Sequence, residues 1–571
     1  MLQRQQVLEQ LESRVHDVLI IGGGINGAAA AAAASGGGAQ VALVDSKDVG
    51  SQTSANSSNL IWGGIKYLEN GDVRLVNELC RCRNQLLQKY PSRIREMRFL
   101  ATIPAGFRKP PWMVYAGAWL YWLFGRGQTQ IPLLMGPQTL TANETMVNAD
   151  HARGAVEYSD AWLVDNDARF TFDFIKSAMR RRALVANYTR AEQSWYQDGL
   201  WHTRICDQLA SGQSNKSASR IVRSRALVNA TGPWVDGYHR HSQQVSQHHH
   251  VFSKGIHLVV PKITEAERVL AFFASDGRLF FVIPMGNRTC IGTTDTRVDS
   301  PEAVVTDEDR QFVLDNVNQR LKLSMPLQAS DVLSERCGVR PLAVSGGAAL
   351  LSGGAAPDRE SGNVQTMSRR HIIEADPHSK RLSIFGGKLT DCINVGNEVC
   401  DQLKAFGLAM HHNPDWFGEA DEKQRQAFYQ TAADAGLNDW CECLNEPLTQ
   451  RWWRRYGMDA FVLLERVQQQ PELLGKVFPS VESGPEQAAL DDIRLVELAY
   501  ARDHEMVATL EDFVRRRTMM ELTIGKQALL ASDALKVIAE QLFGSDAEAQ
   551  LQAYAHGHSV TSCADSRASC S

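Results

Sequence analysis

Three glycines follow the first apolar segment of the chain with the spacing of a phosphate-binding turn. Gly22, Gly24 and Gly27 come directly after the apolar residues 16–21, and an alanine-rich stretch, residues 28–34, comes next. In a strand–turn–helix unit the first glycine permits a tight turn, the second lets the backbone approach a pyrophosphate, and the third lets the helix pack closely on the strand. The helix N-terminus then faces the phosphates with N–H groups and a positive dipole end. The pattern predicts dinucleotide binding.

Two further segments fit the same site. A second apolar run, residues 40–45, ends in Asp45, which is placed to accept a hydrogen bond from the adenosine ribose. The strand, the helix, the second strand and the acid therefore all indicate a dinucleotide-binding unit. A chance glycine-rich loop would not be flanked by all four features. Residues 226–234 read as a strand ending in a Thr231-Gly232 turn, a form typical of a chain passing beside a bound nucleotide.

Composition limits the class of protein around this unit. The chain has 571 residues, 44% apolar and 22% charged, so we expect several globular domains. Its net charge of −5 gives no bulk attraction for nucleic acid. The eleven cysteines form no Cys-x-x-Cys pair, which favours reduced thiols and a cytoplasmic location. We expect no metal site, and we interpret the three histidines at 248–250 as solvated surface, because adjacent side chains cannot all converge on one ion.

The apolar run at residues 112–124 is rich in tryptophan and tyrosine. Its thirteen residues are fewer than the ~20 that a membrane-spanning helix needs. Burial in the core is the simpler interpretation. Because Arg108, Lys109 and Arg126 flank the run, the alternative is a helix in the lipid headgroup layer on the inner face of the membrane.

Several separated motifs resemble those of FAD-dependent glycerol-3-phosphate dehydrogenases, in the same order along the chain. They are the N-terminal glycine unit, residues 53–69, Lys254-Gly255-Ile256-His257, residues 291–295, residues 338–342, Ser368-Arg369, residues 385–390 and the helical segment 510–517. The resemblance extends from about residue 16 to residue 526.

The resemblance implies an α/β fold with an additional α-helical domain. A Rossmann-like FAD-binding domain of the glutathione-reductase or amino-acid-oxidase type (residues 16–75, 150–240 and 360–410) would be combined with an antiparallel-sheet substrate domain (76–149 and 241–359). From about residue 416 the pattern becomes helical, which predicts a C-terminal domain at 416–543 and a flexible tail at 544–571. Dimerisation through the helical domain is expected from the resemblance alone.

The resemblance also implies where the cofactor lies. The pyrophosphate and flavin edge would be contacted by the serines at the start of residues 53–69, and the pyrimidine end of the flavin by a glycine turn that opens a helix. The implied FAD-binding residues are Gly22, Gly24, Gly27, Asp45, Ser54, Ser57, Ser58, Gly232, Gly386, Gly387 and Thr390.

The implied reaction is oxidation of sn-glycerol 3-phosphate to dihydroxyacetone phosphate, with electrons passed to a quinone. Hydride would move to flavin N5 while a base takes the hydroxyl proton. His257 is the candidate base or orienting group, Arg340 would stabilise charge on oxygen, and Lys388 completes the catalytic set. The phosphorylated polyol would be bound by Lys66, Tyr67, Thr294 and Arg369, because a dianion requires cationic donors.

Some positions depart from the family pattern. The family carries Lys, His and Arg where this chain has Asn59, Trp62 and Lys66, and its usual Thr-Tyr-Arg after Thr390 is Asp391-Cys392-Ile393. The substrate-side groups have therefore changed, whereas the cofactor motifs are kept. Two alternatives stay open: a flavin oxidoreductase of another small hydroxy or amino acid, and a non-catalytic FAD-binding protein.

Overall fold

The computed structural model describes residues 4–557 apart from residues 151, 210–218, 275–277, 347–368, 442–444 and 478–492. Ser368, part of one family motif, lies outside the described residues, whereas Arg369 lies inside them.

The first layer is a sheet whose central strands are parallel. The order of its main path is β17 (Ile372–Asp376), β18 (Arg381–Phe385), β10 (Arg220–Asn229), β1 (Val15–Ile21), β2 (Val41–Val44) and β7 (Leu184–Ala186). Strands β18, β10, β1, β2 and β7 run parallel, and β8 (Thr189–Gln197) and β9 (Leu200–Asp207) extend β10 as an antiparallel pair. The carboxyl ends of the parallel strands therefore lie along one edge, where ligands bind in such sheets.

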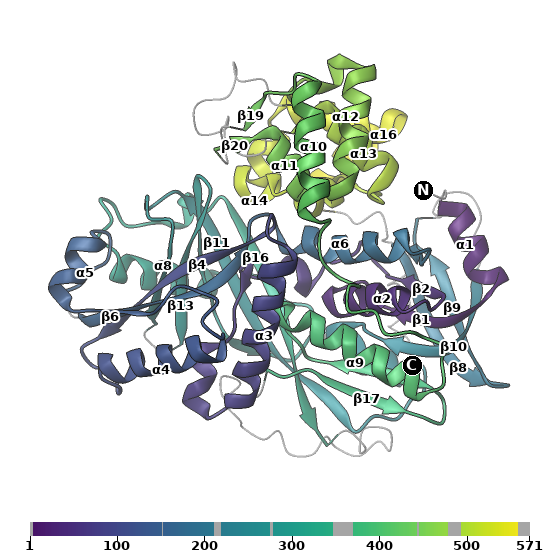
Figure 1. Cartoon of the computed structure of the whole chain (residues 1–571), viewed down its shortest axis with the longest axis horizontal. Coiled ribbons are helices and arrows are strands. Elements are labelled where there is room, and N and C mark those ends of the chain that lie inside the picture. The colour runs from purple at the N-terminus through teal and green to yellow at the C-terminus, as the bar shows by residue number, and fades with distance from the viewer. Residues whose placement is uncertain are drawn as a thin grey trace.

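One face of this sheet is covered by α2 (Ile25–Gly36), α6 (Asp167–Arg180) and α9 (Cys392–Ala405), and the other face contacts α1 (Arg4–Ser13) and α7 (Val235–His241). Helix α2 lies between α6 and α9 (Figure 1). Its run of alanines is fully buried in the main core, because small side chains let the helix approach the strands closely.

The second layer is a largely antiparallel sheet. Its order is β15 (Thr296–Val298), β11 (His248–Pro261), β14 (Arg288–Gly292), β13 (Leu279–Met285), β12 (Val269–Phe273), β4 (Ile94–Pro104), β6 (Ala152–Leu163) and β3 (Leu60–Ile61), with β16 (Ser334–Ser345) paired to β11 and β5 (Leu133–Met135) to β6. Strands β13 and β14 form a hairpin about Gly286 and Asn287. Strand β6 pairs with β4 and not with the first sheet, although residues 150–163 were expected in the nucleotide domain. Helices α3 (Val73–Lys89), α4 (Pro111–Phe124), α5 (Pro137–Asn143) and α8 (Asp307–Arg320) surround this half (Figure 1).

A helical domain forms the C-terminal part, drawn green to yellow above α6 in Figure 1. It contains α10 (Glu422–Asp434), α11 (Leu448–Tyr456), α12 (Ala460–Gln469), α13 (Leu495–His504), α14 (Met520–Ile524), α15 (Lys526–Leu530), α16 (Asp533–Phe543) and α17 (Ala547–His556). Helix α17 falls in the stretch expected to be a flexible tail, and Tyr554 anchors it in the domain core.

The aromatic run forms α4, and core burial is wrong for most of it. Only Ala118 and Tyr121 are buried, whereas Trp112 and Leu123 are 62% and 60% exposed. No helix among the described residues is long and apolar enough to cross a membrane.

Candidate active site

At two positions of the turn after β1, only glycine fits the backbone and its surroundings. Gly22 has a φ of +102°, and a Cβ added there would lie 2.5 Å from the Ala230 carbonyl oxygen. A Cβ on Gly27 would overlap the Gly22 carbonyl oxygen. Gly24 is the N-cap of α2 and has no side chain to accept from the helix N–H groups, and a Cβ added to it would lie 3.3 Å from Ser54 Oγ.

Asp45 lies beside this turn at the end of β2. It accepts hydrogen bonds from the backbone N–H groups of Gly23 (2.6 Å) and Lys47 (2.8 Å). Burial raises the pKa of its carboxyl to about 6, although both hydrogen bonds oppose the shift. The acid is thus fixed at the glycine turn, as expected for a ribose-binding carboxylate.

The other predicted turns converge on the same edge because their strands are parallel to β1. Gly232 (φ +58°) follows β10, and Gly386 and Gly387 (φ +65° and +98°) follow β18. Asn26 in the first turn of α2 donates to the Gly386 carbonyl oxygen at 3.0 Å. This hydrogen bond connects the glycine turn after β1 with the turn after β18. Its Oδ1 is buried without a hydrogen-bond partner in the described structure.

His250 corrects the interpretation of residues 248–250 as solvated surface. Its side chain is buried, and its Nε2 accepts a hydrogen bond from Gly386 N–H at 3.2 Å. His248 instead pairs with Glu374 at 2.9 Å. Both histidines lie in β11 two residues apart, so their side chains share one face of the sheet, where both rings contact Phe385.

The serine segment crosses over this edge between β2 and β3. Ser54 Oγ accepts a hydrogen bond from Ile25 N–H at 2.9 Å, so it caps the first turn of α2 from outside the helix. Ser57 N–H donates to Asp167 at 2.7 Å, and Ser57 Oγ accepts from Asn59 N–H at 3.1 Å. Ser58 is half-buried next to them.

Thr390 and Asp391 lie where β18 leads into α9. Thr390 Oγ1 donates to the Trp62 carbonyl oxygen at 3.2 Å, which ties this turn to the segment after β3. Asp391 forms an ion pair with His371 at 2.5 Å, and the other ring nitrogen of His371 lies 3.0 Å from Glu398. Burial alone would lower the pKa of His371, but the hydrogen bonds to both carboxylates outweigh it and raise the pKa to about 9.

A cluster of cations and one acid occupies the second sheet next to these turns. Arg340 lies 3.3 Å from Asp295 Oδ1, and Arg369 lies 3.0 Å from Asp295 Oδ2. Burial would raise the pKa of Asp295, but the two guanidinium groups hold it below its usual value. The part played by Asp295 is not visible in the sequence, because it depends on the pairing of distant strands.

Thr294 and its neighbour Thr293 fix the direction of Arg340. The Thr294 carbonyl oxygen and Thr293 Oγ1 accept hydrogen bonds from Arg340 at 3.2 and 3.0 Å. The Thr294 hydroxyl itself accepts from Ile256 N–H at 3.1 Å. The Thr294 backbone therefore supports Arg340, while the side chain holds β11.

Lys388 faces an aromatic wall. Its ammonium donates a short hydrogen bond to the Tyr67 hydroxyl and lies 4.1 Å from the Tyr67 ring centroid and 5.2 Å from that of Trp62. Burial lowers the pKa of Lys388, and the Tyr67 contact partly offsets the shift. Lys66 precedes Tyr67 in the 3₁₀ turn at Ile65–Asn70 and is half-buried.

His257 lies on β11 and is 3% exposed. Burial, together with the charges of Arg340 and Arg336, lowers its pKa to about 3, so the imidazole is neutral. Its Nδ1 is buried without a hydrogen-bond partner in the described structure, which leaves a polar atom for a bound molecule.

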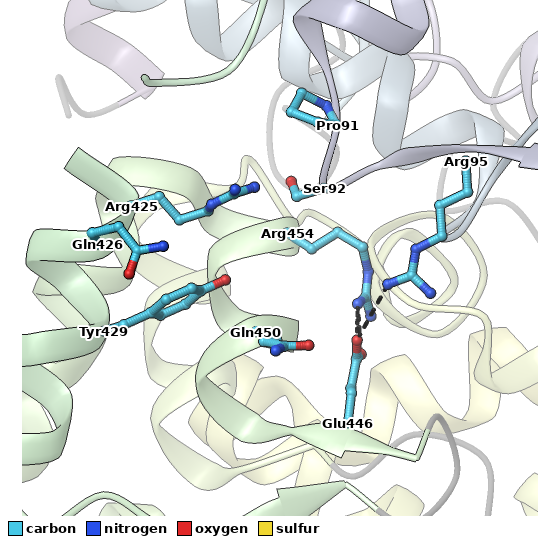
Figure 2. Close-up of a pocket in the computed structure, with 9 residues that line it drawn as sticks. All are labelled: Pro91, Ser92, Arg95, Arg425, Gln426, Tyr429, Glu446, Gln450 and Arg454. Atoms are coloured by element: carbon cyan, nitrogen blue, oxygen red, sulfur yellow. Dashed lines mark hydrogen bonds and ion pairs between the residues drawn. The ribbon is translucent and has the colours of Figure 1, made fainter. Parts of the chain in front are cut away.

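A separate cavity of about 320 Å³ lies where the helical domain meets the start of β4 (Figure 2). Its lining residues are Pro91, Ser92, Arg95, Arg425, Gln426, Tyr429, Glu446, Gln450 and Arg454, which differ from the predicted site residues. Glu446 accepts a 2.6 Å hydrogen bond from Arg454 and is the one carboxylate beside three lining arginines. Among the described residues, no group of His, Cys, Asp and Glu side chains is arranged to hold a metal ion.

Comparison with known proteins places this geometry in a family. Residues 17–364 match the family model of FAD dependent oxidoreductases, and residues 415–550 match that of the C-terminal domain of alpha-glycerophosphate oxidase. A glycerol-3-phosphate dehydrogenase of Pseudomonas aeruginosa is 30% identical, over 89% of this chain and 93% of the relative. The chain belongs to the FAD-dependent glycerol-3-phosphate dehydrogenase family.

Two further relatives are a dehydrogenase named for another phosphorylated polyol and a protein of known structure. A D-erythritol 1-phosphate dehydrogenase of Brucella abortus is 29% identical, over 89% of this chain and 95% of the relative. The crystal structure of a glycerol-3-phosphate dehydrogenase from Bacillus halodurans, complexed with FAD, has a TM-score of 0.71 at 22% identity and covers 97% of this chain and 96% of that one. The predicted fold class and the FAD cofactor are thus confirmed.

The residues of this chain fit the cofactor of the family. The turn at Gly22–Gly27 leaves no Cβ where a pyrophosphate approaches α2, and the unpartnered Asn26 Oδ1 is buried at the same edge. Asp45 and the turns at Gly232 and Gly386 surround this edge from three parallel strands. An extended dinucleotide bound there would meet backbone N–H groups and a carboxylate, which suits the phosphates and the ribose of FAD.

Proposed function

We propose that this protein oxidises sn-glycerol 3-phosphate to dihydroxyacetone phosphate and passes the electrons to a quinone. The observation that carries the proposal is the cluster of Arg340, Arg369 and Lys388: burial lowers the pKa values of Arg340 and Lys388, and the charge of Arg369 lowers both further. A bound phosphate dianion would give these cations a second partner beside Asp295. FAD supplies the hydride acceptor when it is bound.

The proposed cofactor contacts are those of the converging turns. The phosphates would lie against Gly22, Gly24, Gly27 and Gly232, and the ribose would bind Asp45. The remaining contacts with FAD would come from Ser54, Ser57, Ser58, Gly386, Gly387 and Thr390. Their support is the common edge formed by the parallel strands. We propose the same division of domains as expected, with β6 moved to the substrate domain and α17 added to the helical domain.

The proposed substrate contacts are of two kinds: cations and hydroxyl partners that bind the substrate, and a histidine that takes its proton. Arg340, Arg369 and Lys66 bind the phosphate, and Lys388 and Tyr67 hold the polyol hydroxyls. Neutral His257 accepts the hydrogen bond of the reacting hydroxyl and takes its proton. Burial lowers the pKa of His257 most and the Arg340 charge lowers it further, and a bound dianion would offset the second effect. Thr294 acts by positioning Arg340.

Turnover tests this proposal. With sn-glycerol 3-phosphate and a soluble quinone analogue, we expect dihydroxyacetone phosphate to form with reduction of the quinone, and Arg340→Ala to lower kcat/KM strongly. Equal rates with oxygen as the sole acceptor would refute the quinone. Formation of no product with either acceptor would refute the activity.

A phosphorylated polyol other than glycerol 3-phosphate is the second candidate substrate, and the changed wall of the site at Trp62 motivates it. Its ring packs 5.6 Å from Tyr67 and 6.2 Å from Phe281, which replaces a polar imidazole by an apolar wall. A related protein acts on D-erythritol 1-phosphate by name. A panel of phosphorylated and unphosphorylated polyols distinguishes the two, because a higher kcat/KM for the four-carbon phosphate would displace glycerol 3-phosphate.

Peripheral membrane contact through α4 would bring the site to a quinone. One apolar surface is formed by the exposed side chains Trp112, Met113, Leu120 and Leu123 of α4. Strand β5, which carries the exposed Leu133 and Leu134, contacts α4. We expect the protein to float with phospholipid vesicles and the variant Trp112→Ser/Leu123→Ser to float less. Equal flotation of the two proteins would refute this surface. The proposed homodimer is tested separately by light scattering.

A further inference from the structure

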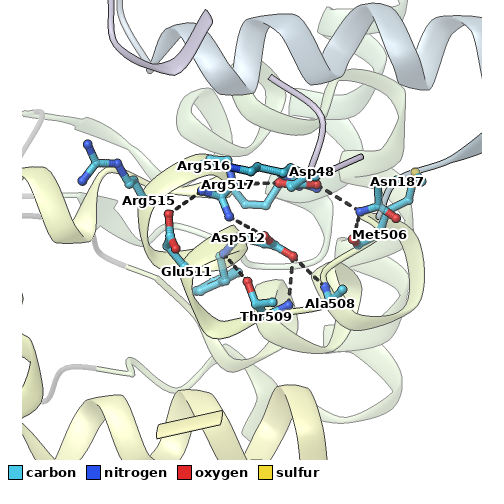
Figure 3. Close-up of polar contacts among 12 residues, drawn as sticks. Asp48, Asn187, Met506, Ala508, Thr509, Glu511, Asp512, Arg515, Arg516 and Arg517 are labelled. Atoms are coloured by element: carbon cyan, nitrogen blue, oxygen red, sulfur yellow. Dashed lines mark hydrogen bonds and ion pairs between the residues drawn. The ribbon is translucent and has the colours of Figure 1, made fainter. Parts of the chain in front are cut away.

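Three consecutive arginines join the helical domain to the FAD-binding sheet. They end the π-helical turn η10 (Asp512–Arg517), a type of turn that is frequent at functional sites. Arg517 forms a two-pronged ion pair with Asp48, at 2.7 and 2.9 Å, and Arg516 Nε lies 2.9 Å from the same carboxylate (Figure 3). Asp48 is completely buried and lies three residues after Asp45.

Asn187, after β7, connects the same cluster to the chain before η10. Its Nδ2 donates to Asp48 at 3.1 Å and to the Met506 carbonyl oxygen at 2.9 Å (Figure 3). Burial would raise the pKa of Asp48, but Arg517 and Arg516 hold it below its usual value. The carboxylate is therefore charged, and its position is set by the helical domain.

Arg515 points away from this cluster in Figure 3. Its Nη2 donates to Asn56 Oδ1 and to the Glu335 carbonyl oxygen, both at 3.3 Å, and its Nη1 pairs with Glu521 of α14. Asn56 also donates to the Gln52 carbonyl oxygen at 2.8 Å. Arg515 thus contacts the far end of the segment that Asp48 begins.

The segment held in this way is residues 48–56, which we call the serine loop. Its middle touches the cofactor edge twice: Gly50 N–H donates to the Gly23 carbonyl oxygen at 3.1 Å, and Ser54 Oγ accepts from Ile25 N–H. Its backbone also passes over Gly338 of β16, where an added Cβ would lie 3.1 Å from the Asn56 carbonyl oxygen. A shift at either end would therefore move Ser54 relative to the first turn of α2.

We propose that the helical domain completes the FAD site, with Arg515, Arg516 and Arg517 acting as positioning residues that hold both ends of the serine loop. The inference rests on the proposed placement of FAD against this loop. Loops that bind a ligand need a fixed geometry, and buried, two-pronged arginine contacts supply one. FAD retention should thus depend on side chains outside the FAD-binding domain.

FAD release from the full-length holoenzyme tests the proposal, measured by flavin fluorescence after dilution. We expect Arg515→Ala to raise the dissociation constant of FAD about tenfold, because it loses charged hydrogen bonds to the loop, and Arg515→Lys to recover part of the affinity. The matched control is Arg466→Ala, which removes a 2.9 Å ion pair to Asp503 within the helical domain and should change FAD affinity less than twofold.

A double-mutant cycle separates positioning from loss of folding. Asn56→Ala should weaken FAD binding as Arg515→Ala does, and the double variant should be no weaker than either single variant, because the two side chains act through one contact. Thermal unfolding of Arg515→Ala should match that of Arg466→Ala. Wild-type FAD affinity in Arg515→Ala, or additive effects in the double variant, would overturn the proposal.

Ser54→Ala distinguishes this failure from failure of the proposed FAD placement. If Ser54→Ala weakens FAD binding while Arg515→Ala does not, the positioning role is wrong and the placement stands. If neither variant weakens FAD binding, both are wrong.

Discussion

The Arg340 guanidinium lies across Gly255 on the neighbouring strand. A Cβ added to Gly255 would overlap Cζ and both terminal nitrogens of Arg340, and would meet no other heavy atom as closely. Strands β11 and β16 pair with Gly255 opposite Gly338, so the glycine provides the space in which Arg340 reaches Asp295.

Gly255→Ala should therefore displace Arg340 while the fold is kept, because the displaced group is the end of a long side chain. We expect kcat/KM for glycerol 3-phosphate to fall about a hundredfold, since misplacement by about 1 Å has that effect in enzyme sites. Steady-state kinetics measures it. Gly237→Ala is the control, because an added Cβ meets nothing within 4 Å there. Unchanged kinetics in Gly255→Ala would show that Arg340 does not contact the substrate.

Asp295→Asn should loosen the pair of guanidinium groups at the proposed phosphate site. The carboxylate holds Arg340 and Arg369 in fixed directions, and an amide provides no charge to do so. We expect KM for glycerol 3-phosphate to rise about tenfold or more, with a smaller change in kcat. A fall in KM would mean instead that Asp295 competes with the substrate phosphate for these cations.

Lys66→Arg restores the family residue and should lower KM for glycerol 3-phosphate several-fold, because a guanidinium binds phosphate with two parallel hydrogen bonds. Competition by inorganic phosphate provides an independent measure and should strengthen in the same variant. If both constants stay at their wild-type values, Lys66 lies outside the phosphate site.

The His371 pair with Asp391 should make stability depend on pH. The folded-state pKa of about 9 exceeds the ordinary value of 6.5, so the stabilisation is complete below about pH 6.5 and is lost as the pH rises through 9. The difference corresponds to a contribution on the order of 3 kcal/mol. Urea midpoints of the wild type and His371→Gln should differ at pH 6.5 and converge near pH 10. A difference independent of pH would contradict this account.

The local features of the FAD edge could be predicted from the sequence. Gly22, Gly27 and Asp45 lie within one strand–helix–strand unit, where spacing alone determines which residues meet. The fold class and FAD also followed, through motifs distributed along the chain.

The remaining relationships depend on strand register and domain contacts, which no local pattern records. Asp295 meets Arg340 only because β11 pairs with both β15 and β16. His250 is buried at Gly386, although adjacent histidines suggested a solvated surface. The exposure of α4 could not be decided from the sequence for a similar reason, because an apolar helix can face either a protein core or a lipid surface.

The proposed reaction requires that a small phosphorylated alcohol reduces the flavin of this protein. Anaerobic mixing of the holoenzyme with sn-glycerol 3-phosphate, followed by flavin absorbance, measures this reduction. We predict that the oxidised-flavin absorbance bleaches with this substrate and persists with glycerol or inorganic phosphate alone. Absorbance that stays unchanged over minutes with sn-glycerol 3-phosphate would contradict the proposed function.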